Sequence, residues 1–181
     1  VISSDKEEFT KKINEYLDEE WDDVLQELGK NASNKGVQYL HTYVNSKGEF
    51  DYVMIDAEQG IPIYDSEYQK EMLAFIRYYP MKVNGHQRIR AEWWTGEDVT
   101  YYIQNENGVF VLDDTEEENP TGHFKYKDVP IGWTKPPFIA FKNNNEMVSD
   151  LKFYKKLIDL YDYLISEGGN DLTGIQRLIY V

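Results

Sequence analysis

The sequence has 181 residues, which suits one domain or one domain with an appendage. It carries 19 Lys and Arg against 33 Asp and Glu, a net charge of −14, and has no basic run, so generic binding to nucleic acid is not expected. Cysteine is absent, which excludes disulfides, thiolate metal sites and cysteine nucleophiles and fits an intracellular origin. No apolar stretch approaches the roughly 20 residues of a membrane-spanning helix, and no signal-peptide pattern is present.

Both ends of the sequence look cut. The first residue is Val1 rather than Met, and the last four residues, Leu178 to Val181, are apolar. Natural termini are more often polar and loosely held. We therefore expect the sequence to be an excised piece of a longer protein.

Residues 1–36 are expected to be helical and acidic. Ser4 followed by Glu7 matches a capping box, and a helical period of apolar residues then continues to Gly36. The apolar positions are Phe9, Ile13, Leu17, Trp21, Val24, Leu25 and Leu28. We interpret the acidic residues between them as a solvated helix face rather than a binding site.

Residues 37–112 are typical of an antiparallel meander. Asn84-Gly85 is the strongest hairpin signal, because both residue types tolerate a positive φ. All the connections are short, which favours strands that pair in sequence order. The expected strands are 37–44, 50–55, 72–83, 88–95, 99–104 and 109–112.

Residues 113–148 are expected to form extended loops. The polar stretch from Asp113 to Gly122 is predicted to be the most mobile part of the chain, and an extended segment ends in the apolar run from Phe138 to Phe141.

Residues 149–181 are expected to form one long helix. Ser149 is a suitable N-cap, with Asp150 in the first turn. A seven-residue apolar repeat keeps its register across Gly168-Gly169, which favours one helix over two. Its positions are Leu151, Tyr154, Ile158, Tyr161, Ile165, Leu172, Ile175 and Ile179. The predicted fold is therefore α+β, a single unit of N-terminal helices, a central antiparallel meander and a long C-terminal helix.

No constellation of residues in the sequence predicts catalysis. His41, His86 and His123 have no partner at metal-ligand spacing, and phosphate-binding and nucleophile motifs are missing. Carboxylate pairs are abundant, but none can be assigned the opposed roles that a glycosidase requires. Trp93-Trp94 should place one ring in the core and leave the other half exposed. We therefore predict no catalytic residue, no cofactor site and no metal site.

The last third of the sequence resembles one protein family. Its motifs match the portal proteins of long-tailed phages of Gram-positive bacteria, and weaker matches in the same order extend upstream over nearly the whole chain. The matching strings are Gly132-Trp133, Pro137 to Asn144, Ser149 to Lys152, Leu157 to Asp162, Asn170 to Leu172 and Ile175-Gln176.

The resemblance implies a structural subunit and not an enzyme. It would cover the wing and the start of the stem of a portal, a closed ring of the dodecamer type at one capsid vertex. Such a ring is the conduit for DNA packaging and ejection, and it docks the terminase, capsid or scaffold proteins and the head–tail connector. DNA would pass through the channel without specific binding. The implied location is the virion, after assembly in the bacterial host cytoplasm or from a prophage, with no membrane partner.

Two other function classes remain open on the residues alone. A small acidic inhibitor or immunity-type binding protein would share the acidity, the small size and the lack of catalytic motifs. A carbohydrate-active enzyme would share the aromatic and carboxylate content, although no acid/base pair can be named.

Overall fold

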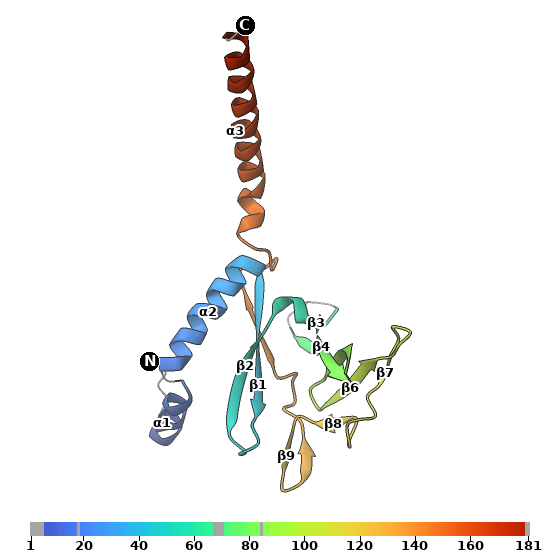
Figure 1. Cartoon of the computed structure of the whole chain (residues 1–181). Coiled ribbons are helices and arrows are strands. Elements are labelled where there is room, and N and C mark those ends of the chain that lie inside the picture. Colours follow the sequence, from blue (N-terminus) through green and yellow to red (C-terminus); the bar gives the residue numbers. More distant parts are fainter. Residues whose placement is uncertain (1–5, 18, 67–70, 84, 180–181) are drawn as a thin grey trace.

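The computed structural model describes residues 6–17, 19–66, 71–83 and 85–179. Its helices and mostly antiparallel strands confirm the predicted α+β class (Figure 1). The helices are α1 (Glu7–Tyr16), α2 (Glu19–Lys35), α3 (Leu151–Ile179) and the short 3₁₀ helix η1 (Ala57–Gln59). Ser4 of the expected capping box lies outside the described residues, and Lys6 stands at the N-cap of α1.

The strands form two sheets and one separate hairpin. Sheet A has the order β11-β1-β2, and sheet B has the order β3-β4-β5-β6-β7 with β8 added to β6. The hairpin pairs β9 with β10. The strands are β1 (Val37–Val44), β2 (Phe50–Ile55), β3 (Gly60–Tyr64), β4 (Met72–Val83), β5 (His86–Trp94), β6 (Asp98–Gln104), β7 (Phe110–Leu112), β8 (Thr121–Gly122), β9 (Phe124–Tyr126), β10 (Val129–Ile131) and β11 (Phe138–Lys142).

The hairpin expected at Asn84-Gly85 is confirmed by the pairing of β4 with β5. Val83 pairs with His86, which leaves a two-residue turn, and Gly85 has a φ of 82°. Asn84 itself lies outside the described residues.

The strands of the predicted meander are divided between two sheets, which local sequence patterns do not indicate. The break between sheets A and B falls between β2 and β3. The stretch 113–148, expected as extended loops, contributes β8 to β11, and β11 pairs with β1 from Val37 opposite Lys142 to His41 opposite Phe138. Sheet A is therefore closed by a strand that arrives from far along the chain.

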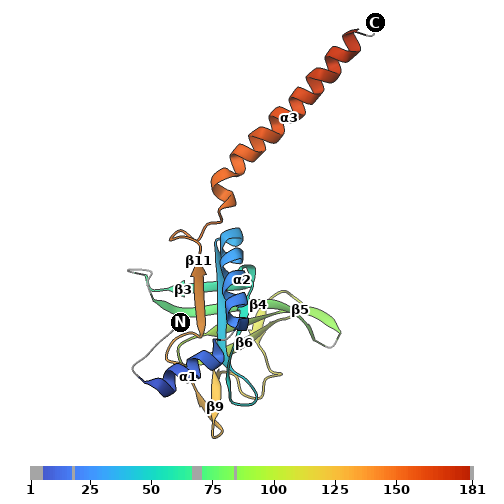
Figure 2. The same ribbon diagram turned by 90° about the vertical axis from the view of Figure 1, so that its left-hand side faces the viewer.

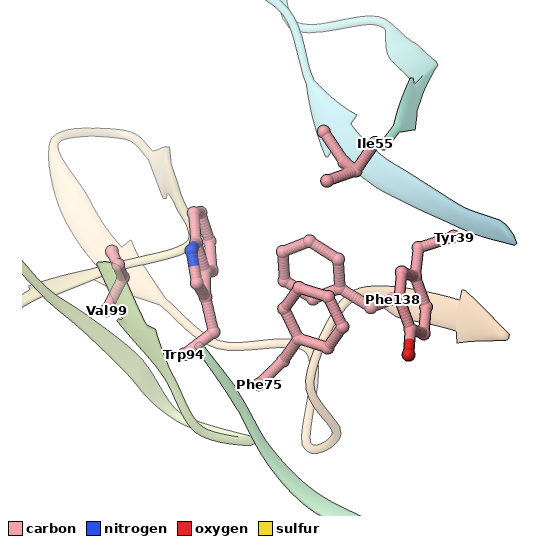
Figure 3. Packing of buried hydrophobic residues seen from close by; sticks show 6 residues of the cluster. All are labelled: Tyr39, Ile55, Phe75, Trp94, Val99 and Phe138. Carbon is pink, nitrogen blue, oxygen red and sulfur yellow. The ribbon is translucent and has the colours of Figure 1, made fainter. Parts of the chain in front are cut away.

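The main core lies between the two sheets (Figure 3). The rings of Phe75 and Phe138 stack with centroids 3.9 Å apart, and His41 stacks on Phe138 at 4.5 Å. Aromatic residues suit this position because they bury a large area and can pack in several geometries. The buried cluster comprises Tyr39, Ile55, Phe75, Trp94, Val99 and Phe138.

Helix α2 covers the other face of sheet A. It lies against β1 and β11, Leu28 is fully buried, and the ring of Trp21 meets that of Tyr52 edge to face at 5.1 Å. The helix ends at Lys35, and Gly36, which follows it, has a φ of 93°. A Cβ there would lie 2.2 Å from the carbonyl oxygen of Met147, so the close approach of these two segments requires glycine. The layer order is α2, sheet A, sheet B.

Helix α3 begins one residue later than expected. Asp150, and not Ser149, stands directly before its first residue, so Asp150 is outside the first turn. The Asp150 carboxylate accepts hydrogen bonds from the Ser33 hydroxyl at 2.6 Å and the Asn143 amide at 2.7 Å, which lower its pKa. The start of α3 is thereby tied to the end of α2.

The prediction of one continuous helix is confirmed. Helix α3 runs for 29 residues through Gly168-Gly169 and projects away from the sheets (Figures 1 and 2). A Cβ at Gly168 would have nothing within 4 Å, so no close contact explains the glycine. Within the described residues, no helix combines the length and apolar character needed to cross a bilayer.

We predict that His41 makes the fold sensitive to mild acid. Burial, followed by the charges of Arg77 and His123, lowers its pKa to about 4. The unfolded chain, with a His pKa of about 6.5, binds the proton more tightly, so stability is complete above this value and falls as the pH drops towards 4. The free energy of unfolding should fall by about 2 kcal/mol between pH 7 and 5. Urea unfolding at the two pH values measures it.

The matched control is His41→Phe, which keeps an aromatic ring beside Phe138 and removes the titrating group. This variant should lose most of that pH dependence. Equal slopes for both proteins would show that His41 is not the group responsible.

Candidate functional site

Sheet B carries a buried charged network on the face that is turned towards sheet A. The Glu92 carboxylate is 4% exposed and accepts hydrogen bonds from the Tyr79 hydroxyl at 2.7 Å and the Trp94 indole N–H at 2.9 Å. The Arg77 guanidinium lies 3.7 Å from it. Burial and then the Glu92 charge raise the pKa of Tyr79 to about 12. Both carboxylate oxygens are therefore engaged, and the arrangement holds the strands together rather than forming an acid/base pair.

A second charged cluster joins β5 to the polar stretch from Asp113 to Gly122, which we call the acidic loop. The Arg90 guanidinium pairs with Asp113 at 3.2 Å, contacts Glu116, and lies 4.5 Å from the centroid of the Tyr101 ring. The buried Asp113 carboxylate also accepts hydrogen bonds from the backbone N–H and hydroxyl of Thr115. Both Asp113 oxygens thus have partners, which leaves this carboxylate in a structural role.

The acidic loop, which the sequence predicts to be the most mobile part of the chain, is held to β6 by the side chain of Asn119. The Asn119 amide donates to the carbonyls of Tyr101 at 2.8 Å and Asp113 at 3.0 Å, and its oxygen accepts the Tyr101 N–H at 2.9 Å. Tyr101 lies on β6 between the residues that pair with β7 and those that pair with β8. The Asn119 side chain therefore makes the hydrogen bonds to Tyr101 that a neighbouring strand would otherwise make. The polar composition of the loop does not indicate this role.

The three histidines have different surroundings, although His41 and His123 both contact the ring of Trp94. His41 is buried in the aromatic core, and His123 accepts the Trp133 N–H at Nδ1 while its Nε2 lies 3.1 Å from the Asp98 carbonyl oxygen. His86 is exposed at the start of β5. Among the described residues, no group of three or more His, Asp or Glu side chains is arranged to hold a metal ion.

The face of sheet B that points away from sheet A is apolar and open. Strand alternation places Trp94 in the core, 7% exposed, and Trp93 on this outer face, 37% exposed, which confirms the expected alternation of the pair. The face holds an open groove of about 540 Å³. Neither α1, α2 nor α3 lies against it (Figure 1). The apolar side chains lining the groove, which we call the outer face, are Ile61, Ile76, Tyr78, Ile89, Ala91, Trp93, Tyr102 and Phe110.

Sequence reasoning missed the outer face. The signal that could have revealed it lies in β3, β4 and β5, which carry apolar residues at both inward and outward positions. The charged Arg77, Arg90 and Glu92 occupy inward positions. A half-exposed sheet normally shows polar residues outside and apolar residues inside. Apolar residues on both faces of these strands are typical of a sheet that is covered on both sides.

Helix α3 exposes two neighbouring rows of apolar side chains. At 100° per residue the two rows together cover about half of the helix surface. Exposed fractions run from 44% to 68%, and in the described part of the chain no strand or helix packs along them (Figure 2). The first row is Leu151, Tyr154, Ile158, Tyr161 and Ile165, and the second is Phe153, Leu157, Leu160 and Leu164. A helix with half its surface apolar normally faces other protein.

We predict that Asn119→Ala releases the acidic loop. The Tyr101 N–H loses its partner, and the free energy of unfolding should fall by about 1–3 kcal/mol. Hydrogen exchange at the Tyr101 amide should accelerate. Glu117→Ala, an exposed change in the same loop, is the control and should alter neither quantity. An unchanged Tyr101 amide in Asn119→Ala would contradict the anchoring role.

Comparison with known proteins places this arrangement in a family. Residues 1–181 match the family described as "Phage portal protein, SPP1 Gp6-like". The chain is 41% identical over 183 residues to a portal protein of Bacillus phage SPP1, covering 100% of this chain and 36% of that protein. It is 32% identical over 188 residues to a portal protein of Clostridium phage phiCD119, covering 96% and 40%. The chain therefore spans well under half the length of these relatives, and it belongs to the SPP1 Gp6-like family of phage portal proteins.

Proposed function

We propose that this chain is the wing and the beginning of the stem of a portal subunit that assembles into a closed ring at the capsid vertex. In this proposal the ring is the conduit for DNA packaging and ejection, and it docks the terminase and the head–tail connector. The location is the virion. The role of the chain is structural and not catalytic.

The observation that carries the proposal is the exposed apolar half of α3. Nine side chains in two rows point away from the helix without a covering element in the described part of the chain. Each buried leucine contributes about 1.5–3 kcal/mol relative to an exposed one, so leaving the rows in water is costly. Two adjacent rows can meet two different neighbours, which is what each subunit of a ring has.

The charge of the chain is compatible with a conduit that DNA passes through. With a net charge of −14, the segment repels phosphate rather than gripping it. The buried arginines are held by carboxylates, as Arg90 is by Asp113 and Glu116, so they are not presented to a polyanion. No specific contact with DNA is proposed for this segment.

The test is a substitution on α3 in a longer portal polypeptide that carries this segment. Leu164→Glu places a charge in the second apolar row and should prevent ring formation, because the loss of about 1.5–3 kcal/mol is repeated at every subunit contact. Sedimentation velocity with electron microscopy measures the assembly. In a separate sample of the 181-residue segment alone, labelled duplex DNA should not co-sediment with the protein.

Ser166→Glu is the matched control, since it adds the same charge two residues away on the polar side of the helix. It should leave the ring intact. Normal assembly of Leu164→Glu would show that this half of α3 does not face a neighbour and would overturn the proposal.

A further inference from the structure

The outer face of sheet B is not covered by any helix of the described part of the chain. Ile61 is 48% exposed, Phe110 is 44% exposed, and Tyr78 and Trp93 are 37% exposed each. An open apolar area of this kind on a sheet is typical of an interaction site. Strand alternation places one lysine, Lys82, at its rim.

The geometry of a ring restricts which surface can cover this face. In a closed ring of more than two identical subunits, each contact joins two different patches, one on each side of the subunit. The outer face therefore cannot meet its own copy in such a ring. Where its complement belongs to this same segment, that complement lies on the opposite side of the chain, beyond sheet A and α2.

Helix α1 has the properties of that complement. It lies on the far side of sheet A from sheet B (Figure 1). None of its residues is buried, and Phe9, Ile13 and Tyr16 recur at helical spacing, with Phe9 55% and Tyr16 42% exposed. Tyr16 touches Phe50 through its ring edge, which leaves the apolar side of α1 largely open.

The dimensions and charges of the two surfaces agree. Ten helical residues extend about 15 Å, which spans three to four strands at about 4.8 Å spacing. The groove is lined by residues from β3 to β7, five strands that span about 19 Å, so α1 can fill most of its width but not all of it. The glutamates on the polar sides of α1, Glu7, Glu8 and Glu15, are available to meet Lys82 at the rim.

We infer that α1 of one subunit docks on the outer face of sheet B of the next subunit around the ring. The partner is thus a second copy of this chain, and the contact is of the head-to-tail type. The inference rests on the proposed function, because it specifies how neighbouring wings meet.

Disulfide trapping tests the contact in this chain, which has no native cysteine. Chains carrying Ile13→Cys are mixed with chains carrying Ala91→Cys at high concentration and oxidised. The mixed disulfide should exceed either self-disulfide by about tenfold, because docking raises the local concentration of only that thiol pair. Trp93→Cys, at an exposed position on the same face, replaces Ala91→Cys if that variant fails to fold.

Lys11→Cys is the matched control, because it lies on the opposite side of α1 from Ile13. Its mixed disulfide with Ala91→Cys should stay at the background level. Equal yields from Lys11→Cys and Ile13→Cys, or a dominant self-disulfide of Ala91→Cys, would overturn the inference. If the disulfide experiment fails while Leu164→Glu still prevents ring formation, only the contact between α1 and the outer face is wrong. If the unsubstituted longer protein does not form a ring, the proposed function itself is wrong.

Discussion

The stacking of Phe138 between the two sheets is the contact on which the rest of the structure depends. Phe138 opens β11, pairs with His41 of β1 in sheet A, and stacks on Phe75 of sheet B at 3.9 Å. One side chain thereby joins three segments that lie far apart in the sequence. Because β11 leads through the turn at 143–150 to α3, this contact also fixes where the long helix leaves the body, and the Asp150 bonds to Ser33 and Asn143 hold its first turn there.

The sequence predicted the elements well and their partners less well. The bounds of β1, β2 and β4 and the continuity of α3 follow from local period and turn chemistry, which act over a few residues. The pairing of β11 with β1 and the anchoring of the acidic loop by Asn119 depend on contacts between distant segments. Local composition carries no signal for them. The inward positions of Arg77, Arg90 and Glu92 also depend on such contacts, since Arg77 pairs with Glu92 and Arg90 pairs with Asp113.

The chain buries ion pairs in sheet B and exposes apolar side chains on α3 and on the outer face, the opposite of what is usual for an isolated domain. Buried ion pairs contribute little net stability, because the cost of removing charges from water offsets most of their attraction. Exposed apolar rows on α3 and the outer face of sheet B lose the contribution that burial would give them. The exposed apolar surfaces suit the proposed portal subunit, whose neighbours in the ring would cover them.

The central claim is that these two surfaces are covered only in the assembled protein. Hydroxyl-radical footprinting of this chain alone and of the longer assembled portal compares them directly. The account predicts that labelling falls on assembly at Leu157 and Leu164 of α3 and at Tyr78 and Trp93 of the outer face, which are exposed in the chain alone. Equal labelling of these four residues in both samples would contradict it.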